Sequence, residues 1–150
     1  MSLATIKTEI ASIVSAVSGV SNVYKRDRWT VNTEQFNAAF KTASGKLMGW
    51  MITRMKTEEI DDTSTGNQAK HWIRIRGVYA ISDADDSETT FEALVEAVRD
   101  ALRAKFGLNG KATHTSPPSA AVVDARKFGG VTCHHAEIYM TATEIVAWSK

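Results

Sequence analysis

The most reactive side chains of this chain lie together in the stretch VTCHHAEIYMTATE, residues 131–144. This stretch contains the only cysteine, Cys133, followed directly by His134 and His135. A cysteine thiolate beside an imidazole can attack a substrate as a nucleophile, and both groups are common zinc ligands. Two chemical hypotheses therefore arise, a cysteine-based enzyme and a metal site.

Strand alternation divides this cluster, because successive side chains of a strand point to opposite faces. One face carries mostly apolar residues: His134, Ala136, Ile138, Met140 and Ala142. The other face carries mostly polar residues: Cys133, His135, Glu137, Tyr139, Thr141 and Thr143. Same-face neighbours stand roughly 7 Å apart, too far for three of them to converge on zinc at about 2.0 to 2.3 Å.

No second group of residues in the sequence completes either site. His71 and His114 belong to no pair with zinc-ligand spacing, and nothing places Cys133 in a positive pocket that would lower the pKa of its thiol. The stretch GLNGK, residues 107–111, lacks the spacing of a phosphate-binding loop. We therefore predict no catalytic residue, metal or cofactor, and we expect water or a neighbouring subunit to cover the face of Cys133 and His135.

Two stretches could form basic patches. YKRDRW, residues 24–29, interleaves three cations with two aromatic rings, a mixture that can bind phosphates and stack on bases. It is short and contains an aspartate, so a solvated edge segment is favoured. Arg54, Arg74 and Arg76 could stand on one face of a predicted hairpin. The favoured alternative is that they pair with acidic residues of the adjoining strand, namely Glu58, Glu59, Asp61 and Asp62.

The predicted second strand of that hairpin has one apolar face, Ile73, Ile75, Tyr79 and Ile81, and one mixed face, Trp72, Arg74, Arg76 and Val78. The mixed face is too apolar for plain solvent and too charged for a plain core, so we expect a partner subunit there. Trp50 and Trp72 are core or edge residues, although aromatic rings are also enriched at interface centres. The predicted interface residues are Trp50, Arg54, Asp61, Asp62, Trp72, Arg74, Arg76, His135 and Glu137.

The spacing of apolar residues along the chain predicts the helices and strands that must position these side chains. Helical spacing is expected over residues 3–18, 33–42 and 91–106, with Thr89 or Thr90 capping the last helix. Strand composition is expected over 47–60, 71–82, 120–128 and 131–147. A polar turn joins the first two strands, and Gly129-Gly130 joins the last two. The sequence predicts one α+β domain spanning residues 1–150, with an antiparallel or mixed β-sheet of hairpins and two main helices on one face.

Composition excludes several classes. Hydrophobic residues make up 43% and charged residues 23%, which is typical of a soluble globular protein. The net charge of +1 gives no overall case for nucleic-acid or membrane binding. No segment approaches the roughly 20 apolar residues that cross a bilayer, and the N-terminus lacks the continuous apolar run of a signal peptide. We therefore expect a protein made and used in the cytoplasm.

The order of parts resembles small neck and tail-completion proteins of tailed bacteriophages, above all tail terminators. The likeness rests on a first helix ending in GVSNVYKRDRW, strands containing GWMITR and HWIRIRGVYAIS, a helix opening SETTFEALVEAVRDALR, and a closing GGVTCHHAEIYMTATE. It implies a structural, non-enzymatic α+β subunit that forms a closed ring, commonly a hexamer, at the head-proximal end of the tail tube.

The resemblance also implies partners and a location. The ring would stop tube growth, contact the tail-tube and head-completion proteins, and pass DNA through its lumen without reading it. Such a protein is assembled in the host cytoplasm and resides in the virion. Residues 82–88, SDADDSE, would either repel DNA from the channel or solvate a helix start. Three alternatives stay open: a head-tail connector or minor tail protein, a metal-dependent Cys/His enzyme, and a monomeric or dimeric binding module.

Overall fold

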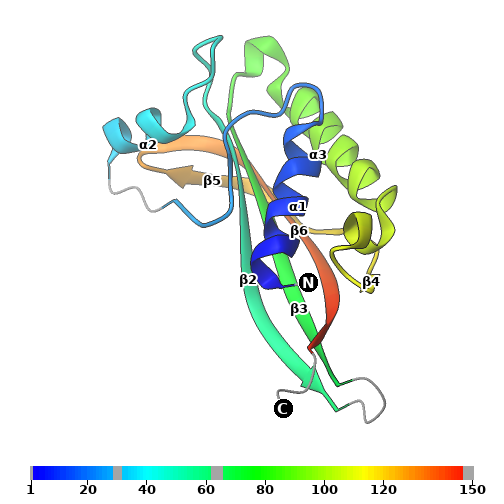
Figure 1. Ribbon diagram of the computed structural model, residues 1–150. Coiled ribbons are helices and arrows are strands. Elements are labelled where there is room, and N and C mark those ends of the chain that lie inside the picture. The colour runs from blue at the N-terminus through cyan, green and yellow to red at the C-terminus, as the bar shows by residue number, and fades with distance from the viewer. Residues whose placement is uncertain (1, 29–31, 62–65, 147–150) are drawn as a thin grey trace.

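The computed structural model describes residues 2–28, 32–61 and 66–146 (Figure 1). Its helices are α1 (Leu3–Ser15), α2 (Thr33–Phe40) and α3 (Ser87–Arg103), with short 3-10 helices η1 (Asp83–Asp85) and η2 (Phe106–Gly110). Its strands are β1 (Val23–Tyr24), β2 (Met48–Ile60), β3 (Asn67–Ala80), β4 (His114–Thr115), β5 (Ser119–Phe128) and β6 (Val131–Val146). The elements confirm the predicted α+β class.

The strands form one sheet in the order β1-β2-β3-β6-β4, with β5 also paired to β6. Every pair is antiparallel except β1 with β2, so the sheet is mixed. Both predicted hairpins are present. Gly129 and Gly130 take φ angles of 56° and 81°, the left-handed region that tight β-turns require and glycine enters at little cost.

The helices α1 and α3 pack against each other and cover one face of the sheet, which we call the helix face (Figure 1). Each helix buries an aliphatic stripe, and the sheet contributes Ile52, Ile73, Ile75 and Ile138 to the same cluster. The helix boundaries differ from prediction. α3 begins at Ser87 after Asp86, whose φ is 51°, so Thr89 and Thr90 lie inside the helix and do not cap it.

Trp50 belongs to this core. It is fully buried, and its ring centroid lies 6.0 Å from that of Phe91. A Cβ at Gly77 would lie 2.7 Å from the Trp50 ring, so the opposite strand needs a glycine to admit the indole. The prediction that Trp50 contributes to a subunit interface is therefore wrong, because the indole has no accessible surface.

Among the helices that the structure describes, only α2 covers the opposite face of the sheet, which we call the open face, and it does so at one end. There α2 packs Phe36 and Phe40 against Met51, Val78 and Cys133. At the other end, β2, β3 and β6 run on as an arm, residues 55–60, 67–72 and 141–146, and β4 pairs with β6 at Ala142 and Thr143 (Figure 1). The open face is therefore sealed under α2 at one end, and the arm at the other end combines buried residues such as Ala69 and Ala142 with exposed ones such as Ile60 and Ile145.

Candidate functional site

Four charged side chains meet in the middle of the open face. Arg74 and Arg76 project from β3, and Glu137 projects from β6 directly opposite Arg76 in the strand register. Asp27 reaches them from the segment that follows β1. Arg74 Nη2 lies 3.1 Å from Asp27 Oδ2, and Arg74 Nη1 lies 3.6 Å from Glu137 Oε1. We call these four residues the charged network.

Arg76 connects the same two carboxylates. Its Nη1 lies 3.9 Å from Asp27 Oδ1 and its Nε lies 3.8 Å from Glu137 Oε1. Only 8% of the Glu137 side chain and 15% of the Asp27 side chain are exposed, so the two cations are neutralised within the chain. Burial lowers the pKa of Arg76, while the charges of Asp27 and Glu137 oppose that shift.

His135 and Asp124 extend the network toward β5. His135 Nδ1 lies 2.7 Å from Asp124 Oδ1, and Arg76 Nε donates to His135 Nε2 at 3.4 Å. An Nε2 that accepts must be unprotonated, so the ring is the neutral tautomer and donates its Nδ1 proton to Asp124. Burial lowers the pKa of His135, and the hydrogen bond from His135 lowers the pKa of Asp124.

Tyr139 closes the network from the next same-face position of β6. Its hydroxyl donates to Glu137 Oε2 at 2.7 Å, and this hydrogen bond raises the pKa of Tyr139. Glu137 is therefore contacted within the chain by Arg74, Arg76 and the hydroxyl of Tyr139. Charges held this closely stabilise one another, and within the network only Asp27 Oδ1 and Arg74 Nε are buried without a hydrogen-bond partner among the described residues.

Five of the nine predicted interface residues do share this face: Trp72, Arg74, Arg76, His135 and Glu137. Arg54 does not. It lies opposite Ile73, on the helix face, and donates to Thr57 Oγ1 at 3.3 Å. A register shift between Arg54 and Lys56 exchanges the faces of β2 beyond that point, so the prediction of three arginines on one face is wrong.

The predicted partners of the arginines are also wrong. Arg74 and Arg76 pair with Asp27 and Glu137, not with the acidic end of β2. Glu58 lies opposite Lys70 in the register, and Asp61 is exposed at the end of the arm. Asp62 lies outside the described residues. In the sequence, Asp27 interrupts a basic stretch, and a lone carboxylate among cations is also the signal of an ion-pair partner.

Cys133 lies at the sealed end of the open face and is fully buried beside Phe36 and Phe40. Burial raises the pKa of its thiol to about 12. The thiolate that a nucleophile requires is therefore disfavoured at neutral pH. The prediction that water or a neighbouring subunit covers Cys133 and His135 is wrong, since α2 and Phe128 of the same chain cover them.

The other histidines are separate from this cluster. His71 lies on the helix face with its Nδ1 2.7 Å from Thr57 Oγ1, and His114 packs edge-on against Phe106. His134 Nε2 lies 2.8 Å from Ser87 Oγ at the start of α3. Within residues 2–28, 32–61 and 66–146, no three histidine, cysteine or acidic side chains are arranged to hold a metal ion.

No protein-family model matches this sequence. A comparison with curated proteins gives no match either. Among the described residues, none of the helices combines the length and apolar character needed to span a membrane. The function must therefore be inferred from the surfaces of the molecule itself.

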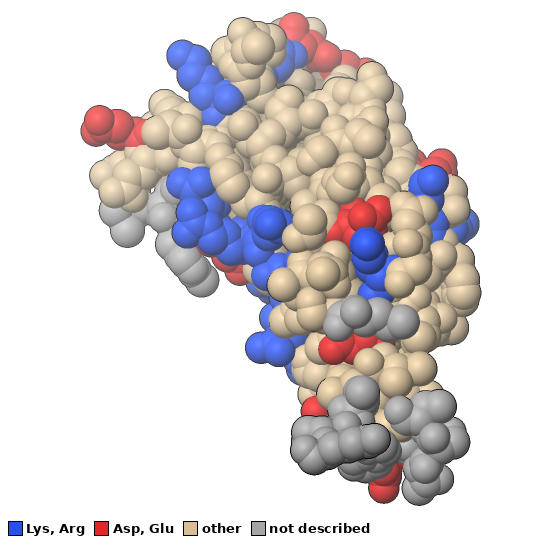
Figure 2. Space-filling view, viewed as in Figure 1, with Lys and Arg blue, Asp and Glu red and all other residues tan. Residues whose placement is uncertain are grey.

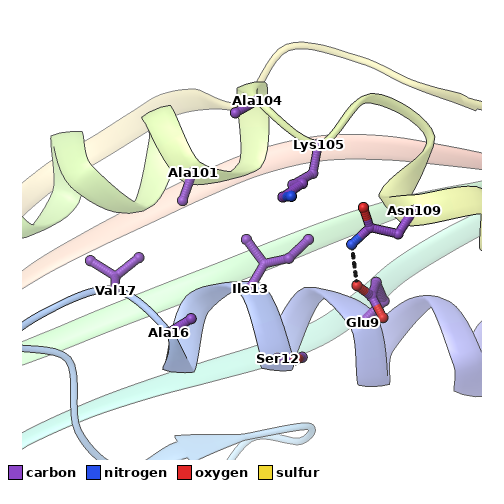
Figure 3. A pocket seen from close by; sticks show the side chains of 9 residues that line it. All are labelled: Glu9, Ser12, Ile13, Ala16, Val17, Ala101, Ala104, Lys105 and Asn109. Atoms are coloured by element: carbon purple, nitrogen blue, oxygen red, sulfur yellow. Dashed lines mark hydrogen bonds between the residues drawn. The ribbon is translucent and has the colours of Figure 1, made fainter.

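A cavity of about 420 Å³ lies on the outer side of the helix layer, between α1 and α3 (Figure 3). Ile13 and Val17 line it from the α1 side, and Ala101 and Ala104 line it from α3 (Figure 3). Its polar rim is closed by a 2.6 Å hydrogen bond from Asn109 Nδ2 to Glu9 Oε1. The walls of this cavity are small apolar side chains, and its polar residues do not converge on one point, so it does not suggest a catalytic or binding site.

The arm end of the open face is more exposed. The Trp72 ring lies between two ammonium groups, with Lys56 Nζ at 4.2 Å and Lys70 Nζ at 4.8 Å from its centroid. Farther out, Ile60 and Ile145 flank Gln68 across three strands and are 44% and 39% exposed. The outer end of the arm therefore carries exposed apolar side chains, and charged side chains lie between it and the middle of the open face.

Proposed function

We propose that this chain is a structural virion subunit that caps the tail tube of a tailed bacteriophage at its head-proximal end. In this proposal copies of the chain form a closed ring, with a hexamer expected. The ring stops tube growth and provides the surface that joins the head-completion protein. DNA passes through its lumen without being read in sequence. The resemblance in the order of helices and strands is one support for this proposal.

The observation that carries the proposal is the exposed arm. Four large apolar side chains are solvent-exposed there: Met55 (51%), Ile60 (44%), Ile145 (39%) and Val146 (40%). Ile60 and Ile145 lie on the open face, and Val146 lies on the opposite face. Burying apolar surface contributes about 25 cal/mol per Å², so exposed apolar side chains along the arm favour association with another protein. We assign the arm to contact with the neighbouring protein of the tail.

The charged network supports a structural role over an enzymatic one. A catalytic carboxylate or histidine needs access to substrate, whereas Glu137 and His135 are buried and paired within the chain. A cysteine nucleophile needs a lowered pKa, and that of Cys133 is raised. The network instead fixes β3, β6 and the segment after β1 to one another, as a rigid assembly subunit requires.

The test is assembly of the purified chain, followed by light scattering and negative-stain electron microscopy. We expect closed rings of one defined mass. A chain that stays monomeric at every concentration, in low and in high salt, would contradict the proposal.

The arm's role is tested with Ile60→Asp/Ile145→Asp, compared with Ile81→Asp. Ile81 is 41% exposed but lies outside the arm, which makes it a matched control. Added to a tail-tube protein from the same phage, the wild type and the control should arrest tube growth. The arm variant should form rings that fail to arrest it. Arrest by both variants alike would contradict the assignment of the arm.

A further inference from the structure

A group of cations lies along the β1–β2 margin of the molecule. Lys25 Nζ donates to Thr8 Oγ1 at 3.3 Å, which holds the segment after β1 against α1. Burial and the charge of Arg54 lower the pKa of Lys7, Lys25 adds to this effect, and Asp27 opposes it. Arg26 is exposed beside them. We call Lys7, Lys25, Arg26 and Arg54 the basic margin.

The basic margin is not neutralised locally. None of its four cations forms an ion pair with any acid of the described ranges. Figure 2 shows lysine and arginine side chains gathered along the β1–β2 side of the molecule. Unpaired cations at this density repel one another, so an acidic partner would stabilise them.

A groove of opposite charge lies between α3 and β5. Its floor is formed by Phe91, Val95, Ala120 and Val123, and Val123 is 59% exposed. All the charged side chains that line it are acidic: Glu88, Glu92, Glu96 and Asp124. We call this feature the acidic groove.

Two of these acidic side chains have partners within the chain, and the other two form no ion pair with any described residue. Glu96 accepts from Arg99 at 2.8 Å, and Asp124 is bonded to His135 and Arg126. In the described part of the chain, Glu88 and Glu92 have no ion-pair partner. The groove therefore combines an apolar floor with two uncompensated carboxylates at its α3 rim.

The basic margin and the acidic groove lie at opposite edges of one sheet. Within the described ranges, β2 is paired on its outer side only at Trp50 and Met51, and β5 pairs with β6 on one side alone. Both edges thus leave backbone groups free for another strand or chain. Contact between unlike edges is head-to-tail, and repetition of such a contact closes a ring when its rotation permits.

We propose that the acidic groove of one copy receives the basic margin of the next copy, so that Glu88 and Glu92 face Lys25 and Arg26 across the subunit boundary. The exposed Val123 lies at the centre of that contact and the ion pairs lie at its rim. This inference rests on the proposed ring and deepens it by naming the surfaces that join its subunits.

Charge reversal tests the pairing. Lys25→Glu/Arg26→Glu and Glu88→Lys/Glu92→Lys should each weaken self-association at least about tenfold, because like charges then face each other. An equimolar mixture of the two variants should associate again, since each margin then meets a groove of opposite charge. The variant with all four changes should also associate, because its margin is then acidic and its groove basic. Sedimentation velocity at low salt measures all four samples.

The control is Glu34→Lys/Asp83→Lys, which changes the net charge by the same amount as the groove variant on two exposed residues outside both surfaces. It should assemble as the wild type does. Circular dichroism and thermal unfolding of every variant establish that folding is intact.

The outcomes separate this inference from the proposed function. Rings that persist in both reversal variants would overturn the pairing and leave the ring proposal standing. A wild type that never assembles would overturn both. A basic margin used for phosphate binding predicts instead that a short DNA duplex is retained by the wild type, that Lys25→Glu/Arg26→Glu abolishes retention, and that mixing the variants restores no assembly. That result would also overturn the pairing.

Discussion

On the helix face, β3 presents Ile73 and Ile75, which are fully buried under α1 and α3. On the open face, the alternating positions of the same strand are Arg74 and Arg76, whose side chains are 26% and 17% exposed. The first pair is covered by helices. The second pair is covered in part by the carboxylates of Asp27 and Glu137, which come from segments on either side of β3.

The two faces of β3 are thus covered by different interactions, apolar packing on one face and ion pairs on the other. Apolar burial is non-directional and tolerates small shifts, whereas a desolvated ion network requires every partner in place. We therefore expect large losses of stability from cavities on the helix face, and smaller losses on the open face that depend on charge and pH.

The largest effect is expected for Trp50→Ala. The indole is fully buried between Phe91 and Gly77, so its removal leaves a cavity that neighbouring strands cannot fill. The free energy of unfolding should fall by about 3 to 5 kcal/mol. Urea denaturation followed by circular dichroism measures the loss. A loss below that of the open-face variant described next would contradict the contrast between the faces.

Glu137→Gln should produce the next largest effect. Glutamine keeps the volume and one acceptor for Tyr139, but Arg74 and Arg76 then share only the charge of Asp27. We expect a loss of about 2 kcal/mol in the free energy of unfolding. Glu59→Gln, an exposed residue of β2, is the control and should lose almost nothing. Equal losses in the two variants would show that the network contributes no stability.

Structural features that depend on a local residue pattern can be predicted from the sequence. The two glycines at 129 and 130 predict a tight turn, and that turn alone sets the register that places Asp124 opposite His135. The aliphatic periodicity of α1 and α3 likewise predicts which side of each helix is buried. These features follow from contacts between residues close in the chain.

The missed features depend on distant segments. The contact of Asp27 with Arg74 spans 47 positions, so its existence depends on the path of the chain after β1. The register shift in β2 near Met55 has no turn residue to mark it, yet it decides on which face Arg54 lies. α2 was expected, but nothing in its amphipathic pattern tells which face of the sheet it covers.

A pH-dependent effect is expected from His135. Its pKa in the folded protein lies below the ordinary value of 6.5, because burial disfavours the charged ring. The unfolded chain therefore binds the proton more readily, and the stability contributed by neutral His135 is present above pH 6.5 and declines as the pH falls below that value.

His135→Asn should remove part of this decline, because the amide can still donate to Asp124 and cannot be protonated in this range. Chemical denaturation between about pH 7.5 and pH 5 gives the slope for both proteins. His114→Asn, at an exposed histidine outside the charged network, is the matched control for the substitution itself. A steeper slope in His135→Asn than in the wild type would contradict the assigned neutral tautomer.

The smallest effect is expected at the arm, where Lys56 and Lys70 approach the Trp72 ring from β2 and β3. Lys56→Met keeps the aliphatic stem and removes the ammonium, so it isolates the cation–π contribution, which is about 0.5 to 1 kcal/mol at exposed positions. In a Trp72→Leu background the same substitution should change stability hardly at all. The difference between these two effects is the coupling free energy of the pair. A coupling near zero would mean that the arm gains no stability from the contact between Lys56 and Trp72.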